Sequence, residues 1–523
     1  MIEVILNKLS DGMKVKAFFP IVLLMIIVCG VFAQEVKPVK IESGMLQGMI
    51  ENGVTVYKGV PFAEPPIGEL RWHPPQPLQP WNGVRIADKF SPNQIQVMVK
   101  EYGPWTAEYQ PQGEISEDCL YLNIWTAAKS PNENHPVLVY IPGGAFTGGS
   151  GNVPVYNGEN LAKKGVVVVT INYRVGVIGF FTHPELTKES QNNSSGNYGL
   201  LDQLAAIEWV KKNISVFGGD PNSITIMGQS AGAASVHYLT ASPLAKGLFI
   251  RAIAMSGSNA QIGPIQNLKS AEQNGVKFAQ AKGAASLAEL RKMSADDLLN
   301  STIEEFRFRP IIDGWFLPKS VDEIFVAGEQ SDVITLTGLV ADEGSASNNY
   351  GKLTVNNFRM RVKEQAGDQA DEILRLYPSV TEEECSESQK MLSREMSMFS
   401  MYLWAINRAK TSKTDVYTYI FTHQQPGETK ERYLAFHSSD LPYVFDNLKY
   451  SPRPWTNEDK KLAGIMSSYW VNFITTGNPN GNGLPEWPPF NESNKQIMEL
   501  GDEIGFRSIM KDEKFEVFKT ILK

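Results

Sequence analysis

The sequence predicts an α/β fold, in which helices cover both faces of a large, mostly parallel, doubly wound sheet. From residue 136 onward, short and continuously apolar runs rich in β-branched residues recur along the chain. Such runs are typical of strands that are buried on both faces. Segments with apolar residues at helical spacing separate them. This alternation predicts parallel pairing, because each strand returns to the sheet through a helix.

The predicted elements follow one another in a regular order. The apolar runs predict strands at residues 136–141, 166–173, 223–227, 249–257, 333–340 and 415–423. Helical spacing predicts helices at residues 200–217, 231–241 and 457–475. Residues 262–310 show little strand pattern and predict a helical insertion. No repeat, linker or shift of composition divides the chain, so we expect residues 34–523 to form a single domain.

The first 33 residues differ in composition from the rest of the chain. Two lysines precede an apolar run at residues 17–33, and Val31 and Ala33 suit the positions before a cleavage site. The run is shorter than the roughly 20 residues that a membrane span needs. We therefore expect residues 1–33 to be a signal peptide, with Met13 as an alternative start. The mature chain is then secreted or periplasmic and has no membrane span.

Charge and cysteine content exclude some classes of protein. The 523 residues carry a formal net charge of −8 and no basic block, so nucleic acid is not an expected partner. Only three cysteines occur, and Cys29 falls within the predicted signal peptide. Cys119 and Cys385 remain, and the sequence leaves open whether they pair. A chain of this length buries enough core to fold without a disulfide.

The segment IMGQSAGAASV, at residues 226–236, places Ser230 between a predicted strand and a predicted helix. A serine at such a junction must turn sharply if its hydroxyl is to project beyond the sheet, and Gly228 and Gly232 allow that close approach. The N-terminal amides of the following helix favour negative charge nearby. This pattern predicts that Ser230 is a nucleophile and that the N–H of Ala231 is an oxyanion donor.

A serine needs a base, and at such an elbow the acid and the histidine follow the serine in the chain. That order removes His73, His135 and His183. His237 also follows Ser230, but it lies about two turns along the predicted helix and is too far away to reach the serine. His423 and His437 remain, and we favour His437 because it lies in a loop between apolar segments.

The acid is expected at the end of the strand at 333–340, where Asp342 and Glu343 are adjacent. Asp313 is a third candidate, and the pattern alone does not choose among the three.

Acyl transfer also needs hydrogen-bond donors for an oxyanion. A glycine-rich loop, PGGAFTGGSG, follows the predicted strand at 136–141 directly. We expect the segment Gly143, Gly144 and Ala145 to supply these donors together with Ala231. No cofactor or metal ion is needed for such a site.

Several long motifs resemble the type B carboxylesterase and cholinesterase-like family of α/β-hydrolases. They are GVTVYKGVPFAEPPIGELRWHPPQPLQPW, SEDCLYLNIW, the segment from GNYGLLDQ to GQSAGAASV, ADEG and YWVNFITTGNPNG. These motifs occur in the family's order and cover nearly all of the expected mature chain. The resemblance implies an α/β-hydrolase fold and the hydrolysis of carboxylic esters of small molecules.

The resemblance also implies roles for individual residues. The family's acid falls on Glu343 and its histidine on His437, within the context AFHSSDLPYVF. Its oxyanion amides fall on Gly144, Ala145 and Ala231. The resemblance further implies a structural ion pair between Arg71 and Glu117, and a supporting position near the triad for Ser256.

The chain departs from the family pattern at several positions. Pro142 replaces an aromatic residue or histidine before the glycines, and Gln229 replaces the more common glutamate before the nucleophile. Cys119 matches a disulfide cysteine whose usual upstream partner is absent, so we expect it to be unpaired with that segment. Trp105 is the nearest aromatic residue to the family's choline-binding tryptophan but does not match it, so a cholinesterase is not expected.

Three functions remain as hypotheses. The first is a serine carboxylesterase that acts through an acyl-enzyme, on esters whose alcohol is fairly bulky. The second is a non-catalytic adhesion module, because the family contains such members. The third is a hydrolase that cleaves an amide or a specialised natural-product ester, since the same groups can serve either bond.

Overall fold

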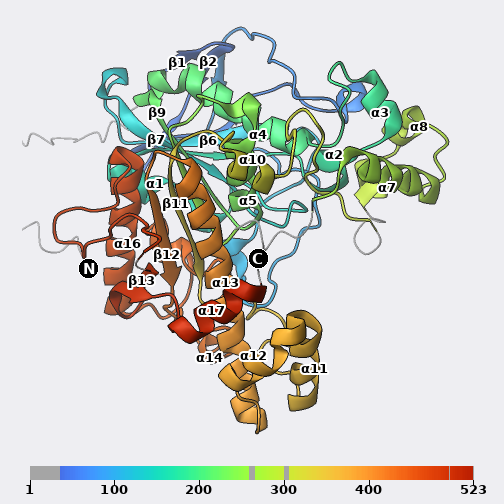
Figure 1. The fold of residues 1–523 in the computed structure, drawn as a ribbon. Helices are drawn as coiled ribbons and strands as arrows, with labels where there is room; N and C mark the ends of the chain where they lie inside the picture. Colours follow the sequence, from blue (N-terminus) through green and yellow to red (C-terminus); the bar gives the residue numbers. More distant parts are fainter. Residues whose placement is uncertain (1–35, 258–264, 300–305, 494, 522–523) are drawn as a thin grey trace, which may run out of the picture. The chain divides into compact units, whose positions relative to one another are not determined.

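A sheet of eleven strands forms the centre of the computed structural model, which describes residues 36–257, 265–299, 306–493 and 495–521 (Figure 1). The strands lie side by side in the order β14-β13-β12-β11-β10-β9-β7-β8-β6-β4-β3. Their bounds are β3 (Met49–Glu51), β4 (Val54–Pro61), β6 (Tyr121–Thr126), β7 (His135–Ile141), β8 (Val167–Ile171), β9 (Gly219–Gln229), β10 (Arg251–Met255), β11 (Ile334–Val340), β12 (Val416–Phe421), β13 (Gln496–Leu500) and β14 (Ile504–Ser508).

The strands from β8 to β13 pair in parallel, which confirms the predicted fold class. All six predicted strands are present, with ends that shift by a few residues. The sequence pattern did not predict the antiparallel margins, where β3, β4 and β6 join one side of the sheet and β14 joins the other. It also missed a small separate sheet of β1 (Val39–Ile41), β2 (Gly44–Gln47) and β5 (Val84–Ile86).

Helices cover both faces of the sheet (Figure 1). The helices of the described residues are α1 (Glu159–Lys163), α2 (Gly176–Phe180), α3 (Pro184–Glu189), α4 (Tyr198–Asn213), α5 (Ala231–Ala241), α7 (Leu268–Ala281), α8 (Leu287–Lys292), α9 (Ala295–Leu299), α10 (Val321–Ala327), α11 (Val355–Ala366), α12 (Ala370–Leu376), α13 (Glu382–Thr411), α14 (Lys430–Tyr433), α15 (Leu441–Val444), α16 (Asn457–Thr476) and α17 (Asp512–Ile521). The predicted helices correspond to α4, α5 and α16, and the predicted insertion contains α7, α8 and α9.

Alternate side chains of the central strands enter two separate apolar cores. Val137 and Val139 of β7 pack in the core that contains residues of α4 and α5. Leu138 and Tyr140 of the same strand pack in the core that contains residues of α1 and α16. This alternation follows from the pleat of the strand, and it explains why the strand sequence is apolar at every position.

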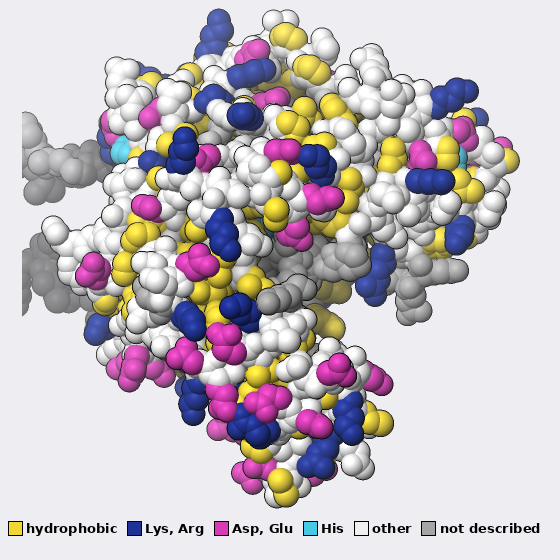
Figure 2. Space-filling model, viewed as in Figure 1, with side chains coloured by type: hydrophobic (Ala, Val, Ile, Leu, Met, Phe, Trp, Pro, Cys, Tyr) yellow, Lys and Arg dark blue, Asp and Glu magenta, His cyan; other side chains and the backbone are white. Residues whose placement is uncertain are grey.

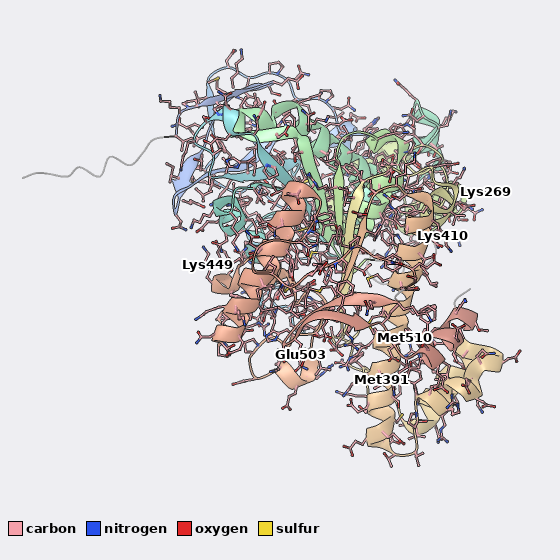
Figure 3. All side chains as sticks on the ribbon, turned by 60° about the vertical axis from the view of Figure 1, so that its left-hand side comes forward. Lys269, Met391, Lys410, Lys449, Glu503 and Met510 are labelled. Atoms are coloured by element: carbon pink, nitrogen blue, oxygen red, sulfur yellow. The ribbon has the colours of Figure 1, made fainter. Side chains whose placement is uncertain are left out.

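The helices α11 and α12 form a lobe at the end of the long helix α13 (Figure 1), and neither was predicted from the sequence. The C-terminal helix α17 packs against α12 and α13. Figure 3 shows Met391 of α13 and Met510, which precedes α17, in this region of the chain. Lys514 of α17 lies 2.8 Å from Glu395 of α13, so an ion pair joins these two helices.

Residues 36–523 form one compact unit. The predicted signal peptide and Cys29 lie outside the described residues, so that assignment and the domain boundary at residue 34 stay predictions. No helix within the described residues is long and apolar enough to span a membrane. Basic and acidic side chains are interspersed over the face shown in Figure 2. Cys119 and Cys385 are both buried and are not bonded to each other.

Candidate active site

Ser230 occupies the turn between the end of β9 and the first residue of α5. Its backbone has φ 59° and ψ −124°, a conformation that non-glycine residues adopt rarely and that is typical of functional sites. Hydrogen bonds hold the strained turn in place. The N–H of Ser230 donates to the carbonyl of Met255 at 2.9 Å, and its carbonyl accepts from Ala234 at 3.0 Å.

Two glycines make this turn sterically possible. A Cβ atom on Gly228 would collide with the backbone of Gly232. A Cβ atom on Gly232 would collide with the carbonyl oxygen of Ile141, at the end of β7. The spacing of these glycines around Ser230 therefore follows from close packing. The turn lies against β9, which precedes it, and against the neighbouring strand β7.

His437 and Glu343 lie in contact, although 94 residues separate them. Nδ1 of His437 pairs with a carboxylate oxygen of Glu343. Glu343 follows β11, and a bridge between Asp342 and Phe436 joins its loop to the histidine loop. Burial disfavours the charged imidazolium, but the adjacent Glu343 carboxylate outweighs burial and raises the pKa of His437 above its ordinary value.

The opposite ring nitrogen of His437 faces Gln229, the residue directly before Ser230. The side-chain Nε2 of Gln229 lies 3.1 Å from Nε2 of His437. If Nδ1 carries the proton toward Glu343, the other nitrogen presents a lone pair that accepts from the glutamine amide. The imidazole therefore lies beside the Ser230 turn. The Ser230 hydroxyl has no hydrogen-bond partner among the described residues.

The other acidic candidates have different partners. The buried carboxylate of Asp342 accepts from Tyr350 and from Nε of Arg394, both at 2.8 Å, so it points away from His437. Asp313 accepts from the backbone N–H of Leu317 at 2.8 Å and from the hydroxyl of Ser194 at 2.8 Å. Those contacts are typical of a carboxylate that stabilises a turn.

The other histidine candidates also lie elsewhere. His423 contacts Asp459 at 2.8 Å and Asp502 at 2.5 Å. His237, which follows Ser230 on α5, is buried with its ring 4.8 Å from that of Trp404. Burial and the positive charge of Arg408 lower the pKa of His237 to about 3, so it is a neutral, packed side chain.

The glycine-rich loop after β7 runs directly against the Ser230 turn. A Cβ atom on Gly143 would lie 3.1 Å from Cβ of Ser230. Gly144 and Ala145 have φ values of 119° and 56°, which bend the loop around this point. The backbone N–H groups of Gly144, Ala145 and Ala231 donate to no other group within the described residues. They are thus free to bind a ligand oxygen.

Two polar contacts at this site escaped the sequence analysis. Asp440 is buried three residues after His437, and its carboxylate accepts from Tyr419 at 2.9 Å. Burial raises the pKa of Asp440 to about 7, with a further contribution from the Glu343 carboxylate. Trp105 donates from its indole nitrogen to the carbonyl of His437 at 3.0 Å and so supports the histidine loop.

The structure also describes the other residues to which the family resemblance gave roles. Nε of Arg71 donates to Glu117 at 2.7 Å, within a two-pronged ion pair of the kind that the resemblance implied. Ser256 follows β10, and its buried hydroxyl has no partner among the described residues. No group of three or more His, Cys, Asp or Glu side chains in the described part of the chain is arranged to hold a metal ion.

A comparison with models of protein families matches residues 35–518 to the family described as "Carboxylesterase family". The chain belongs to the carboxylesterase family. Its fold is accordingly that of the α/β-hydrolases, and the enzyme is a carboxylesterase that hydrolyses carboxylic esters.

Three curated relatives carry names of esterases. Fumonisin B1 esterase of Sphingopyxis macrogoltabida is 38% identical over 484 residues, which cover 89% of this chain and 86% of the relative. Para-nitrobenzyl esterase of Bacillus subtilis (strain 168) is 33% identical over 90% of this carboxylesterase and 96% of its own length. Cocaine esterase of Homo sapiens is 32% identical over 96% of this carboxylesterase and 94% of its own length.

Proposed function

We propose that this carboxylesterase hydrolyses esters through an acyl-enzyme on Ser230. The observation that carries the proposal is the position of His437, which contacts Glu343 through one ring nitrogen and lies beside the Ser230 turn through the other. The same three roles, nucleophile, base and orienting acid, recur in serine hydrolases of unrelated folds.

In the first half of the reaction, Oγ of Ser230 attacks the ester carbonyl while Nε2 of His437 takes its proton. Glu343 holds the Nδ1 proton and stabilises the resulting imidazolium. The carbon–oxygen bond to the alcohol then breaks, and His437 returns the proton to the departing alkoxide. In the second half, His437 deprotonates a water molecule, which attacks the acyl-enzyme. The bond to Oγ of Ser230 then breaks, and His437 returns the proton to Oγ as the carboxylic acid leaves.

The amides of Gly144, Ala145 and Ala231 are the proposed oxyanion donors. Negative charge develops on the carbonyl oxygen in each tetrahedral intermediate, and preorganised donors lower its energy. Two features support this role. All three N–H groups lack another acceptor among the described residues, and Ala231 begins the helix α5, whose N-terminus favours an anion.

We further propose that the alcohol side of the substrate is bulky. The loop beside Ser230 contains Gly143, Gly144 and Ala145, so no long side chain from these positions fills the space near the nucleophile. The names of the relatives point to large substrates, and fumonisin B1 and a para-nitrobenzyl ester belong in the first substrate panel. Matched amides in that panel separate an esterase from an amidase.

The non-catalytic alternative is disfavoured by the same geometry, because a binding module has no need for a strained serine beside a paired histidine. Labelling with a fluorophosphonate probe, followed by mass spectrometry of the peptides, tests the proposal. We expect one label on Ser230, and no label in Ser230→Ala. A folded chain that takes no label, or takes it on another serine, contradicts the proposal.

A further inference from the structure

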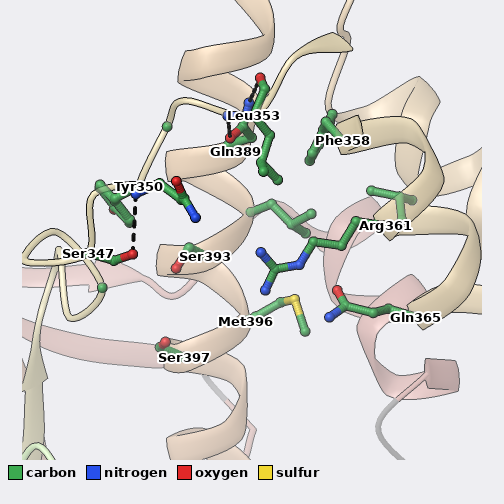
Figure 4. Close-up of a pocket in the computed structure, with 15 residues that line it drawn as sticks. Ser347, Tyr350, Leu353, Phe358, Arg361, Gln365, Gln389, Ser393, Met396 and Ser397 are labelled. Atoms are coloured by element: carbon green, nitrogen blue, oxygen red, sulfur yellow. Dashed lines mark hydrogen bonds between the residues drawn. The ribbon is translucent and has the colours of Figure 1, made fainter. Parts of the chain in front are cut away.

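A cavity of about 400 Å³ lies between α11, α13 and the loop that joins β11 to α11 (Figure 4). Cavities of this volume accommodate small organic ligands. Neither Ser230 nor His437 is among the described residues that line it. Glu343 is not a lining residue either, although its neighbour Gly344 is.

Arg361 is the one charged side chain among the described residues that line this cavity. It extends from α11 toward Ser393 and Met396 on α13, as Figure 4 shows. It forms no ion pair or hydrogen bond with any described residue, whereas Arg359 on the same helix is held by Ser379. Arg361 is exposed, and its guanidinium donors are available to a ligand in the cavity that it lines.

Neighbouring polar groups add donors without adding negative charge. Ser393 and Ser397 line the cavity from α13 at a spacing of four residues, so both hydroxyls lie on the same face of that helix. Tyr350 also lines it, but its hydroxyl donates to Asp342, whose charge is already paired with Arg394. The polar part of the cavity is therefore cationic and rich in donors.

The remaining wall is apolar. Phe358 and Val362 contribute from α11, and Leu392 and Met396 from α13. A cation and hydroxyls that lie beside apolar side chains are complementary to an amphiphilic anion. Arginine matches the two oxygens of a carboxylate better than a single point charge does, because its donors form a planar fork.

We propose that this cavity binds an organic carboxylate with an apolar body, held by Arg361 and the hydroxyls of Ser393 and Ser397. Carboxylic acids are the products of ester hydrolysis, so such a ligand can be released by the enzyme itself or come from the medium. Gly344, which directly follows Glu343, is also a lining residue, so the cavity adjoins the loop that carries the proposed acid.

Octanoate is the probe, and isothermal titration calorimetry of the full chain is the measurement. We expect octanoate to bind more tightly than 1-octanol, which has the same apolar body without the charge. Arg361→Gln should weaken octanoate binding about fivefold, the upper range for a solvent-accessible charge pair. Arg361→Lys should bind with intermediate affinity, because it keeps the charge and loses the fork.

Lys363→Gln is the matched control, because Lys363 lies on the same helix but does not line the cavity. It should leave the affinity for octanoate unchanged, and so should Ser230→Ala. An affinity that falls in Ser230→Ala but not in Arg361→Gln places octanoate at the catalytic serine and overturns the proposal. Equal affinities for octanoate and 1-octanol, or no binding, also overturn it. All of these outcomes are independent of whether Ser230 is the nucleophile.

A crystal structure with octanoate separates the two sources of ligand. Octanoate in this cavity of the resting enzyme shows capture of a free acid. The second source is tested by the rate of hydrolysis of an octanoyl ester. If the octanoate released during turnover changes this rate as added octanoate does, the product binds at the same site. Arg361→Gln should then abolish both changes in rate.

Discussion

The side-chain Nε2 of Gln229 lies 3.1 Å from Nε2 of His437, the ring nitrogen opposite the one that contacts Glu343. In the proposed mechanism, this nitrogen takes the Ser230 proton. In the resting enzyme the glutamine amide therefore competes with the serine hydroxyl for the same lone pair. A neutral donor at this position also stabilises the neutral imidazole, whereas a carboxylate would stabilise the imidazolium.

Gln229→Glu tests this relationship through the pH profile. His437 acts as a base only when it is neutral, so kcat/KM falls as the pH drops below the pKa of His437. A carboxylate beside Nε2 raises that pKa, and the acidic limb of the profile should move to higher pH by about one pH unit. The measurement is kcat/KM for a p-nitrophenyl ester across the neutral pH range and into mild acid and base.

Gln229→Met is the control, because it removes the amide donor without adding charge. It should shift the acidic limb much less than Gln229→Glu does. If Gln229→Glu leaves the limb where it is in the wild type, Gln229 does not govern the protonation of His437.

Glu343→Gln should move the acidic limb of the kcat/KM profile to lower pH, opposite to the effect of Gln229→Glu. The Glu343 carboxylate raises the pKa of His437, so its removal lowers that pKa and extends the neutral form to lower pH. The loss of the orienting acid should also lower kcat by about 10⁴-fold, as in other triads. Kinetics across the pH range measure both effects.

Asp342→Asn serves as the neighbouring comparison, because Asp342 contacts Arg394 and Tyr350 instead of His437. It should lower the melting temperature, since it leaves Arg394 without its partner, but retain far more of kcat than Glu343→Gln. The reverse order of kcat would assign the acid to Asp342.

Gly232→Ala should damage both the fold of the elbow and the activity. The added methyl group meets the carbonyl oxygen of Ile141, and neither backbone segment can move without displacing a central strand. We expect a loss of about 2 kcal/mol or more in the free energy of unfolding, together with loss of esterase activity.

Gly464→Ala is the matched control for this substitution. Gly464 lies within α16, and no atom of a neighbouring residue stands within 4 Å of the point where an added Cβ atom would sit. Alanine favours helices over glycine by about 1 kcal/mol, so this variant should be at least as stable as the wild type and fully active. Denaturant unfolding of both variants provides the measurement, and a stable, active Gly232→Ala would refute the steric account.

The proposed space near Ser230 predicts hydrolysis of esters of branched alcohols. The loop that contains Gly143 and Ala145 places little side-chain volume near the nucleophile. Release of tert-butanol from tert-butyl acetate, measured by gas chromatography, is the expected result. Activity confined to esters of small linear alcohols would count against this substrate class.

Features of the fold and the site that depend on residues close together in the chain could be predicted from the sequence. The sharp turn at Ser230 was predictable because the strand, the helix and the two glycines all lie within a few residues of it. The parallel strands were recognisable for a similar reason, since burial on both faces leaves a continuous apolar run. The margins of the sheet were missed, because β3 is only three residues long and none of its residues is buried.

The contacts between distant segments could not be predicted from the residues alone. Asp342 and Glu343 are adjacent and chemically alike, and only the path of the folded loop turns one to Arg394 and the other to His437. The family resemblance was needed to choose between them. The contact between Gln229 and His437 joins residues that are 208 positions apart, and no local pattern encodes such a distance.

The central claim is that Ser230 is the nucleophile, and the initial rate of p-nitrophenyl ester hydrolysis by Ser230→Ala tests it most directly. The variant should keep the melting temperature of the wild type within a few degrees, because only one hydroxyl is removed. Its kcat should fall by about 10⁴-fold or more, since the remaining groups stabilise a transition state without forming an acyl-enzyme. A folded Ser230→Ala that hydrolyses the ester at the wild-type rate would contradict the account.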